Sequence, residues 1–120
     1  LIPESFESRA VAQKDELVEA LNRVRLLAQK SAPVKLLFDE GNLIMSAQSQ
    51  DVGAAKESLL VQYEGESLEI GFNPEFLLAG AMSVPDEEVD MRFISPLRPG
   101  LLRGKDEDFL YLIMPIRLND

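Results

Sequence analysis

The residues that could support catalysis in this chain are few, because it contains neither histidine nor cysteine. Their absence removes the usual general base, the Ser-His pair and thiolate metal sites. Two segments superficially suit a cation or a phosphate, Asp86-Glu87-Glu88-Val89-Asp90 and Gly100-Leu101-Leu102-Arg103-Gly104-Lys105. The first lacks the ligand spacing and glycine of an EF-hand loop, and the second lacks the spacing of a phosphate loop. We therefore interpret the acidic run as a solvated loop and expect no metal, cofactor or catalytic constellation.

The stretch whose chemistry suits binding is the last one, residues 109–118, where apolar residues occupy both faces of an expected strand. They are Leu110, Leu112, Met114, Ile116 and Leu118 on one face, and Ile113 and Pro115 on the other. Such a strand is either fully buried or partly covered by a partner. Pro115 lacks a backbone donor, and the flexible Met114 suits a surface that accepts several partners. Leu97 and Pro99 could add a neighbouring wall, although the pattern alone favours ordinary core packing.

The periodicity of apolar residues predicts two helices. Residues 14–29 have apolar positions at helical spacing. These are Leu17, Leu21, Val24 and Ala28, with Val18 and Leu27 widening the stripe. Asn73 and Pro74 predict the start of a second, short helix that ends near Ser83, because asparagine caps helices and proline suits their first position.

Period-two alternation and turn residues predict eight strands. These span residues 6–13, 34–38, 43–48, 57–63, 67–72, 88–94, 97–102 and 109–118. We expect hairpin turns at 39–42 and at 64–66, the second joining strands 57–63 and 67–72. Pro99-Gly100 predicts that strand 97–102 is an edge strand or a bulged one. The fold class is therefore α+β with mainly antiparallel sheets.

Composition and charge fit one soluble domain. The 120 residues are 46% hydrophobic and 28% charged, and no apolar run reaches the roughly 18 residues that span a membrane. The net charge of -9 argues against nucleic-acid binding by bulk electrostatics, although residues 14–30 carry a small positive excess. The absence of cysteine fits a reducing cytoplasm. Because the first residue is Leu1 rather than methionine, we expect a fragment of a longer protein.

Four segments in register resemble one family. The ending Tyr111-Leu112-Ile113-Met114-Pro115-Ile116-Arg117-Leu118 is similar to the C-terminus of the bacterial beta sliding clamp, the processivity subunit of DNA polymerase III. Tyr63-Glu64-Gly65-Glu66-Ser67-Leu68-Glu69-Ile70-Gly71-Phe72-Asn73 resembles the segment before the family's second helix. Leu17 with Ala20-Leu21-Asn22-Arg23-Val24 resembles its first helix, and Leu1-Ile2-Pro3 the junction that leaves the preceding domain.

The resemblance implies a DNA-clamp domain, in which two helices pack on curved, mainly antiparallel sheets. Residues 1–120 would be the C-terminal, third domain of a clamp subunit, present as an isolated fragment. Two three-domain subunits would close a ring around DNA, with helices lining the hole and sheets forming the outer wall. The domain would be cytoplasmic and non-catalytic, with no membrane partner.

The resemblance also implies a groove that receives a short peptide with a glutamine and paired hydrophobic residues. Its partners would be clamp-binding motif peptides of DNA polymerases, the clamp loader and repair proteins. Asn73 and Arg117 could satisfy polar groups of the ligand. The groove positions are Leu1, Asn73, Phe76, Leu97, Pro99, Leu112, Ile113, Met114, Pro115, Ile116 and Arg117.

The remaining positions implied by the resemblance concern DNA and ring closure. Arg23 is expected to face double-stranded DNA in the full ring, with Lys14 and Arg25 as further candidates, and solvated helix charges are the alternative for all three. The first domain of a second subunit would contact four positions. They are Leu26 and Leu27, with Asp51 and Glu57 as ion-pair partners. A generic α+β protein-interaction module remains an alternative function, as does a small enzyme that uses carboxylates.

Overall fold

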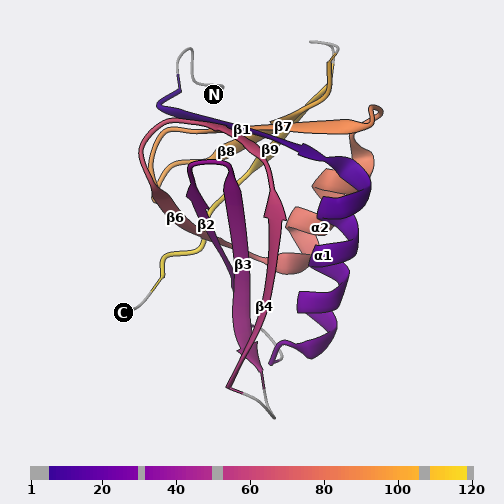
Figure 1. Cartoon of the computed structure of the whole chain (residues 1–120), viewed down its shortest axis with the longest axis vertical. Helices are drawn as coiled ribbons and strands as arrows, with labels where there is room; N and C mark the ends of the chain where they lie inside the picture. Colours follow the sequence, from indigo (N-terminus) through magenta and orange to yellow (C-terminus); the bar gives the residue numbers. More distant parts are fainter. Residues whose placement is uncertain (1–5, 30–31, 50–52, 106–108, 119–120) are drawn as a thin grey trace.

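The computed structural model (Figure 1) describes residues 6–29, 32–49, 53–105 and 109–118. This part of the chain forms two helices and nine strands. The helices are α1 (Lys14–Leu27) and α2 (Pro74–Ser83). The strands are β1 (Ser8–Gln13), β2 (Val34–Asp39), β3 (Asn42–Ser49), β4 (Gly53–Leu60), β5 (Gln62–Glu64), β6 (Leu68–Phe72), β7 (Glu88–Phe93), β8 (Gly100–Arg103) and β9 (Leu110–Ile113).

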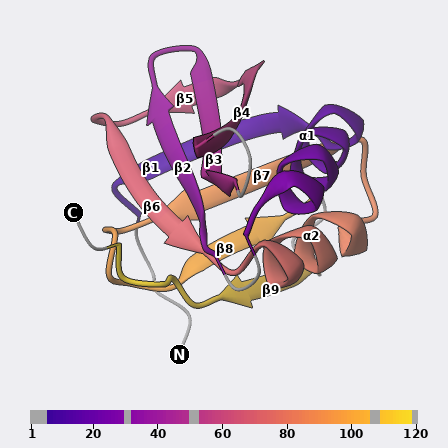
Figure 2. The ribbon, with the colours of Figure 1, turned by 90° about the horizontal axis from the view of Figure 1, so that it is seen from below.

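The strands form two antiparallel sheets, which confirms the predicted α+β class. One sheet has five strands in the order β5-β1-β7-β8-β9, and the other has four in the order β4-β3-β2-β6. The five-stranded sheet lies across the top of Figure 1, while β2, β3 and β4 run along the length of the molecule. Seen from below, α1 and α2 lie side by side along one flank of the sheets (Figure 2).

Aromatic rings join the two sheets in the core. Phe38 of β2 lies 5.2 Å from Phe93 of β7, measured between ring centroids, and it stacks on Tyr63 of β5 at 5.5 Å. Phe72 of β6 lies 6.1 Å from the Phe93 ring. Aromatic pairs at these separations stabilise a core beyond the area that they bury. The core is completed from α1 by Leu17, Ala20, Leu21 and Val24.

The helix predictions are confirmed in position but not at every end. The side-chain oxygen of Asn73 accepts the N–H groups of Glu75 at 2.8 Å and Phe76 at 3.3 Å, which is the expected N-cap. The first helix ends at Leu27 rather than at residue 29, because Ala28 takes extended geometry and bridges to Ser49 of β3. Leu27 is consequently exposed and does not extend the buried stripe.

Three strand predictions are wrong, and each failure concerns pairing. The expected strand 57–63 is two strands, because the chain changes sheets at the buried Val61. β5 then pairs with β1 and β6 with β2, so no hairpin joins residues 57–63 to 67–72. β8 is an interior strand between β7 and β9, since Pro99 precedes it and leaves every donor of β8 available. The last strand ends at Ile113 rather than at residue 118, and within the described residues β9 is the edge of its sheet.

Candidate functional site

β9 presents a row of apolar side chains to solvent at the edge of the five-stranded sheet. Leu110 and Leu112 are exposed, and Met114, which continues the row, is 65% exposed. Ile113 points inward and is only 3% exposed, as the alternation of a strand requires. β9 pairs with β8 on one side only, so its other backbone edge is open within the described residues. Exposed apolar side chains along an open edge are the usual mark of an interaction surface.

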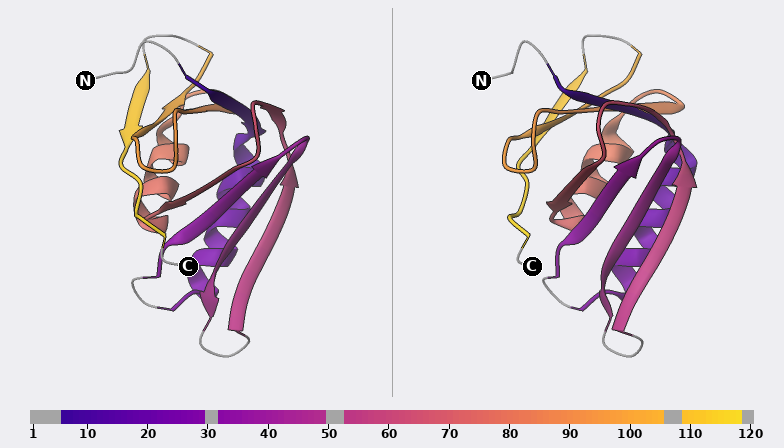
Figure 3. Two further views of the ribbon diagram at one scale, coloured as in Figure 1. Left: turned by 90° about the vertical axis from the view of Figure 1, so that its left-hand side faces the viewer. Right: turned by 60° about the vertical axis from the view of Figure 1, so that its left-hand side comes forward.

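After β9 the chain crosses to the other sheet. The half-buried Pro115 lies at the crossing, and the N–H of Ile116 then donates to the carbonyl oxygen of Gly71 in β6 at 2.8 Å. Figure 3 shows this C-terminal segment passing beside β6, away from α1. A Cβ atom at Gly71 would lie 2.6 Å from a methyl carbon of Leu118, so glycine is what permits the close approach.

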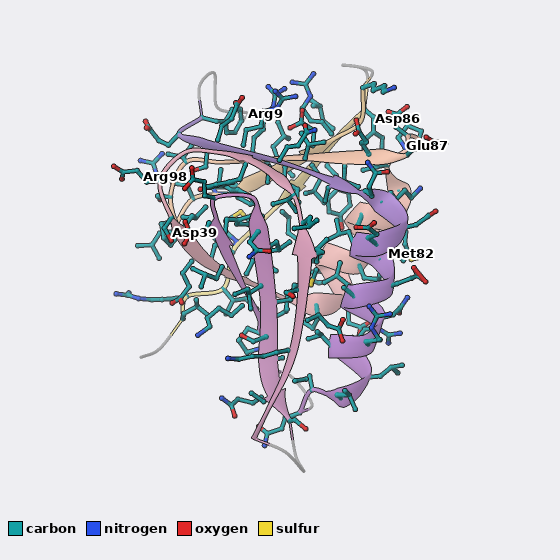
Figure 4. The ribbon with its side chains drawn as sticks, in the orientation of Figure 1. Arg9, Asp39, Met82, Asp86, Glu87 and Arg98 are labelled. Carbon is teal, nitrogen blue, oxygen red and sulfur yellow. The ribbon has the colours of Figure 1, made fainter. Side chains whose placement is uncertain are left out.

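The crossing segment forms one wall of a pocket, which we name the C-terminal groove. The groove is lined by β6, by a turn at Pro96 and Leu97, and by residues 116–118. The side-chain oxygen of Ser95 accepts the N–H of Leu97 at 3.3 Å, and the backbone carbonyl oxygen of Ser95 accepts the N–H of Arg98 at 3.3 Å. This turn holds Leu97 outward, 64% exposed. In Figure 4, Arg98 lies on the side of the molecule away from α1 and Met82.

The start of α2 is tied to the back of β9. The hydroxyl group of Tyr111 donates to the carbonyl oxygen of Phe76 at 3.3 Å. Gly80 allows the contact, because a Cβ atom there would lie 2.7 Å from the Tyr111 ring. Phe76 itself is exposed. Asn73 uses its side-chain oxygen as the helix cap, so its amide N–H groups are the part of the side chain left to meet a ligand.

The structure places most of the predicted groove residues in four groups. Leu97, Ile116 and Arg117 line the C-terminal groove, whereas Leu112 and Met114 stand on β9. Asn73 and Phe76 lie at the start of α2, and the half-buried Pro99 and Pro115 flank β8 and β9. Ile113 belongs to the core and can only support the surface from beneath. Leu1 lies outside the described residues.

The cations predicted to face DNA differ in how they are held. The guanidinium of Arg23 pairs with the carboxylate of Glu57 on β4 at 3.0 Å, and this hydrogen bond raises the pKa of Arg23. The ammonium of Lys14 donates to the carbonyl oxygen of Val84 at 2.6 Å. Arg25 donates to Asn22 at 2.9 Å and pairs with Glu75 at 3.5 Å. Lys14 and Arg25 therefore bind α1 to α2 and its following loop, and Arg23 is the most exposed of the three.

Two of the four positions predicted to close the ring, Leu26 and Leu27, lie at the end of α1. Leu26 is 72% exposed and Leu27 is also exposed. Glu57 lies on β4, the outermost strand of its sheet within the described residues, and Asp51 lies outside them. Leu60, at the other end of β4, is 78% exposed and was not singled out by the sequence pattern.

The acidic run 86–90 has structural contacts rather than a catalytic arrangement. The carboxylate of Asp90 accepts hydrogen bonds from Arg9 at 2.8 Å and from Arg92 at 3.2 Å. Burial alone would raise the pKa of Asp90, but hydrogen bonds and positive charge from Arg9 and Arg92 outweigh it and lower that pKa. Asp86 accepts the N–H of Lys105 at 2.6 Å, and Figure 4 shows Asp86 and Glu87 together at one end of the five-stranded sheet.

Comparison with known proteins identifies the family of this domain. A family model described as the DNA polymerase III beta subunit, C-terminal domain, matches residues 1–117. The chain belongs to this family. It is 40% identical to the beta sliding clamp of Streptomyces coelicolor over 126 aligned residues, which cover 99% of the chain and 34% of the relative. It is 36% identical to the beta sliding clamp of Streptococcus pneumoniae, covering 99% of the chain and 33% of that protein.

Solved structures of clamps share the fold of this domain. The DNA polymerase III beta subunit of Thermotoga maritima superposes with a TM-score of 0.90 at 36% identity, over 98% of the chain and 33% of that structure. A Pseudomonas aeruginosa sliding clamp bound to griselimycin superposes with a TM-score of 0.91 at 28% identity, over 98% of the chain and 32% of that structure. The clamp domain thus spans about a third of the length of the curated relatives that it matches. None of its described helices is long and apolar enough to cross a membrane.

Two features of this clamp domain were missed by the sequence analysis. Gly71 received no role, although a glycine inside an otherwise apolar strand signals that another segment approaches closely. Leu110 was placed on the correct face of the last strand but was left out of the predicted groove, and it extends the exposed row on β9.

Proposed function

We propose that this domain docks short peptides of DNA polymerases, the clamp loader and repair proteins, as the non-catalytic third domain of a ring-shaped replication clamp. The observation that carries the proposal is the row of exposed apolar side chains on β9, next to the C-terminal groove. Leu112 and Met114 would bury the hydrophobic anchors of the peptide, together with Leu97. Anchors of this kind contribute most of the affinity in peptide recognition.

Polar groups beside the apolar row would fix the orientation of the peptide. Within the described residues the side chain of Arg117 forms no ion pair, so it is available to a carbonyl or carboxylate of the ligand. The amide N–H groups of Asn73 are available to a side-chain carbonyl such as that of glutamine. The open edge of β9 adds backbone donors and acceptors for an extended ligand.

Related clamps support a ligand-binding role. Sliding clamps of Pseudomonas aeruginosa and Bartonella birtlesii, both 28% identical to this chain, have been solved bound to griselimycin. The proposal extends ligand binding to this chain and assigns it to the surface formed by β9 and the C-terminal groove.

The whole protein would be a processivity factor that encircles double-stranded DNA in the cytoplasm. Leu26 and Leu27, with Asp51 and Glu57, would contact the first domain of a second subunit, and the exposure of the two leucines supports this. Arg23 would face the hole, with Lys14 and Arg25 behind it. A ring holds DNA by enclosure and needs few phosphate contacts, which is compatible with a net charge of -9.

The proposal is tested by titrating the domain with a fluorescent Gln-Leu-x-Leu-Phe peptide. We expect saturable binding that is lost in a folded Met114→Asp/Leu97→Asp double variant, because the two carboxylates would meet the apolar anchors. Leu60→Asp is the control, since it places a carboxylate at an exposed leucine on β4. If wild-type domain and full-length clamp both fail to bind, the peptide role is wrong. If Leu60→Asp weakens binding as much as the double variant, the assigned surface is wrong.

A further inference from the structure

A second pocket borders the C-terminal segment, on the outer face of the four-stranded sheet. Its charged lining consists of Lys35, Lys56 and Arg117, and the polar Ser46 and Gln48 also line it. No aspartate or glutamate is among the described residues that line it. The chain has 12 lysines and arginines against 21 aspartates and glutamates, so a pocket whose charged lining residues are all cations runs against its composition. We name this site the basic pocket.

Strand register sets the spacing of the charges. Ser46 of β3 pairs with Lys35 of β2 on one side and with Lys56 of β4 on the other. The three residues therefore form a row across the sheet, and the two lysines stand roughly 10 Å apart, twice the distance between neighbouring strands. Gly71 of β6 extends the row, because it pairs with Lys35 on β2. It also bridges to Ile116, the residue before Arg117.

Most of this positive charge is not neutralised within the protein. Lys35 pairs with Glu69 at 3.7 Å, and both side chains are well exposed, so the pair is weak. In the described part of the chain neither Lys56 nor Arg117 forms an ion pair. Two cations without partners and one loosely held cation thus surround the same pocket.

The basic pocket is continuous with the C-terminal groove. Residues 116–118 line both sites, so they form a shared wall with the groove on one side and the basic pocket on the other. A peptide chain that leaves the groove over Ile116 would reach Arg117 first and the two lysines next.

We propose that the basic pocket binds an acidic stretch that flanks the docked peptide. This inference rests on the proposed function. An extended chain advances about 3.3 Å per residue, so carboxylates about three positions apart would match the two lysines. Nucleic acid is a less suitable ligand for this pocket. Its closely spaced phosphates would meet only three cations, and the protein's net charge of -9 would repel them.

The test compares three labelled peptides that share the Gln-Leu-x-Leu-Phe core. One has uncharged flanks, one has three glutamates before the core, and one has three glutamates after it. At low salt we expect one acidic peptide to bind about fivefold more tightly than the uncharged one, an advantage that disappears at about 0.5 M salt. The Lys35→Gln/Lys56→Gln variant should lose this advantage and bind the uncharged peptide as the wild type does. Lys105→Glu changes the net charge equally at a distant site and should keep the advantage.

Each outcome separates the inference from the proposed function. Equal affinity for all three peptides, or an advantage that survives in the double lysine variant, overturns the inference and leaves the groove intact. If the uncharged peptide binds neither the domain nor the full-length clamp, the proposed function fails, and a glutamate-rich peptide without the core is then titrated by NMR. Shifts of the Lys35, Ser46 and Lys56 amides would still support the basic pocket, and their absence would refute it. Tighter binding of duplex DNA that depends on both lysines would assign the pocket to nucleic acid instead.

Discussion

The backbone of Ile116, beyond the end of β9, is hydrogen-bonded to Gly71 of β6. The N–H of Ile116 donates to the carbonyl oxygen of Gly71 at 2.8 Å, while a Cβ atom at position 71 would lie 2.9 Å from the carbonyl oxygen of Ile116. The contact fixes residues 116–118, which form one wall of the C-terminal groove. The absence of a side chain at one position of β6 thus determines the shape of the site.

Substituting Gly71 with alanine should displace the C-terminal segment. The added methyl group overlaps the backbone of Ile116 and the side chain of Leu118, and overpacking of this kind costs about 1–2 kcal/mol of unfolding free energy. We expect affinity for the core peptide to fall about tenfold, a loss of about 1.4 kcal/mol. Denaturant unfolding and peptide titration measure the two effects.

Gly41→Ala is the matched control for this change. Gly41 has a φ of 73° and open space around it, so alanine there strains the turn by about 1 kcal/mol without touching the groove. It should lower stability by a comparable amount and leave peptide affinity unchanged. If Gly41→Ala weakens peptide binding as Gly71→Ala does, the loss reflects general destabilisation rather than the shape of the groove.

Gly80→Ala should loosen α2 from β9. A Cβ atom at Gly80 would lie 2.7 Å from the ring of Tyr111 and 2.8 Å from Leu102. The clash outweighs the better helix propensity of alanine, and we expect a net loss of about 1–2 kcal/mol in urea unfolding. Ala79→Ser, at an exposed position of the same helix, should change stability by less than about 0.5 kcal/mol. Equal stability of Gly80→Ala and the wild type would show that α2 can shift relative to β9 and make room for the added methyl group.

The sequence predicted those parts of the fold that depend on short-range rules. Asn73 caps α2 as its side-chain chemistry requires, and Gly41 turns the β2–β3 hairpin with the positive φ expected of it. Strict alternation placed Leu110, Leu112 and Met114 on one face of the last strand, and all three are exposed together. Each of these features depends on neighbours within a few residues.

Strand partners could not be predicted, because the alternation of a strand specifies its faces and not its neighbours. Val61 continues the apolar alternation of β4, so nothing local signals that the chain changes sheets there. The approach of Ile116 to Gly71 joins residues 45 positions apart in the sequence, and the row of Lys35 and Lys56 arises only from the pairing of three strands. The groove residues were named from family resemblance, and the structure supplies the geometry that the pattern lacked.

Asp90 should make stability depend on pH in the acid range. Its folded-state pKa is lowered, so its contribution is complete above the unfolded-state pKa of about 4 and is lost as pH falls through the folded value. At pH 7, Asp90→Asn should cost about 1–2 kcal/mol, because Arg9 and Arg92 lose a charged acceptor. The difference between wild type and variant should shrink below about pH 4.

Thermal unfolding followed across this pH range measures the effect. Glu66→Gln, which removes an exposed carboxylate, serves as the control and should follow the wild-type profile. A difference between Asp90→Asn and the wild type that stays constant from neutral to acid pH would mean that the Arg9–Asp90–Arg92 cluster does not stabilise the fold through its charge.

In the full-length subunit, Leu26→Asp/Leu27→Asp should weaken ring closure. Both leucines are exposed in this domain, and aspartates there would place unpaired charge in an apolar subunit contact. Sedimentation velocity should show dimer in the wild type and mostly monomer in the variant. Leu97→Asp, in the C-terminal groove, should remain dimeric. A dimeric Leu26→Asp/Leu27→Asp protein would place the subunit contact elsewhere.

The most direct test of the account is methyl-resolved NMR of the domain during titration with the Gln-Leu-x-Leu-Phe peptide. We predict that the methyl resonances of Leu97, Leu112 and Met114 shift together and saturate with one dissociation constant. Those of Leu26 and Leu60, which are more exposed but lie outside the groove, should stay in place. Saturable shifts confined to Leu26, Leu60 or Met82 would contradict the assignment of the peptide site to β9 and the C-terminal groove.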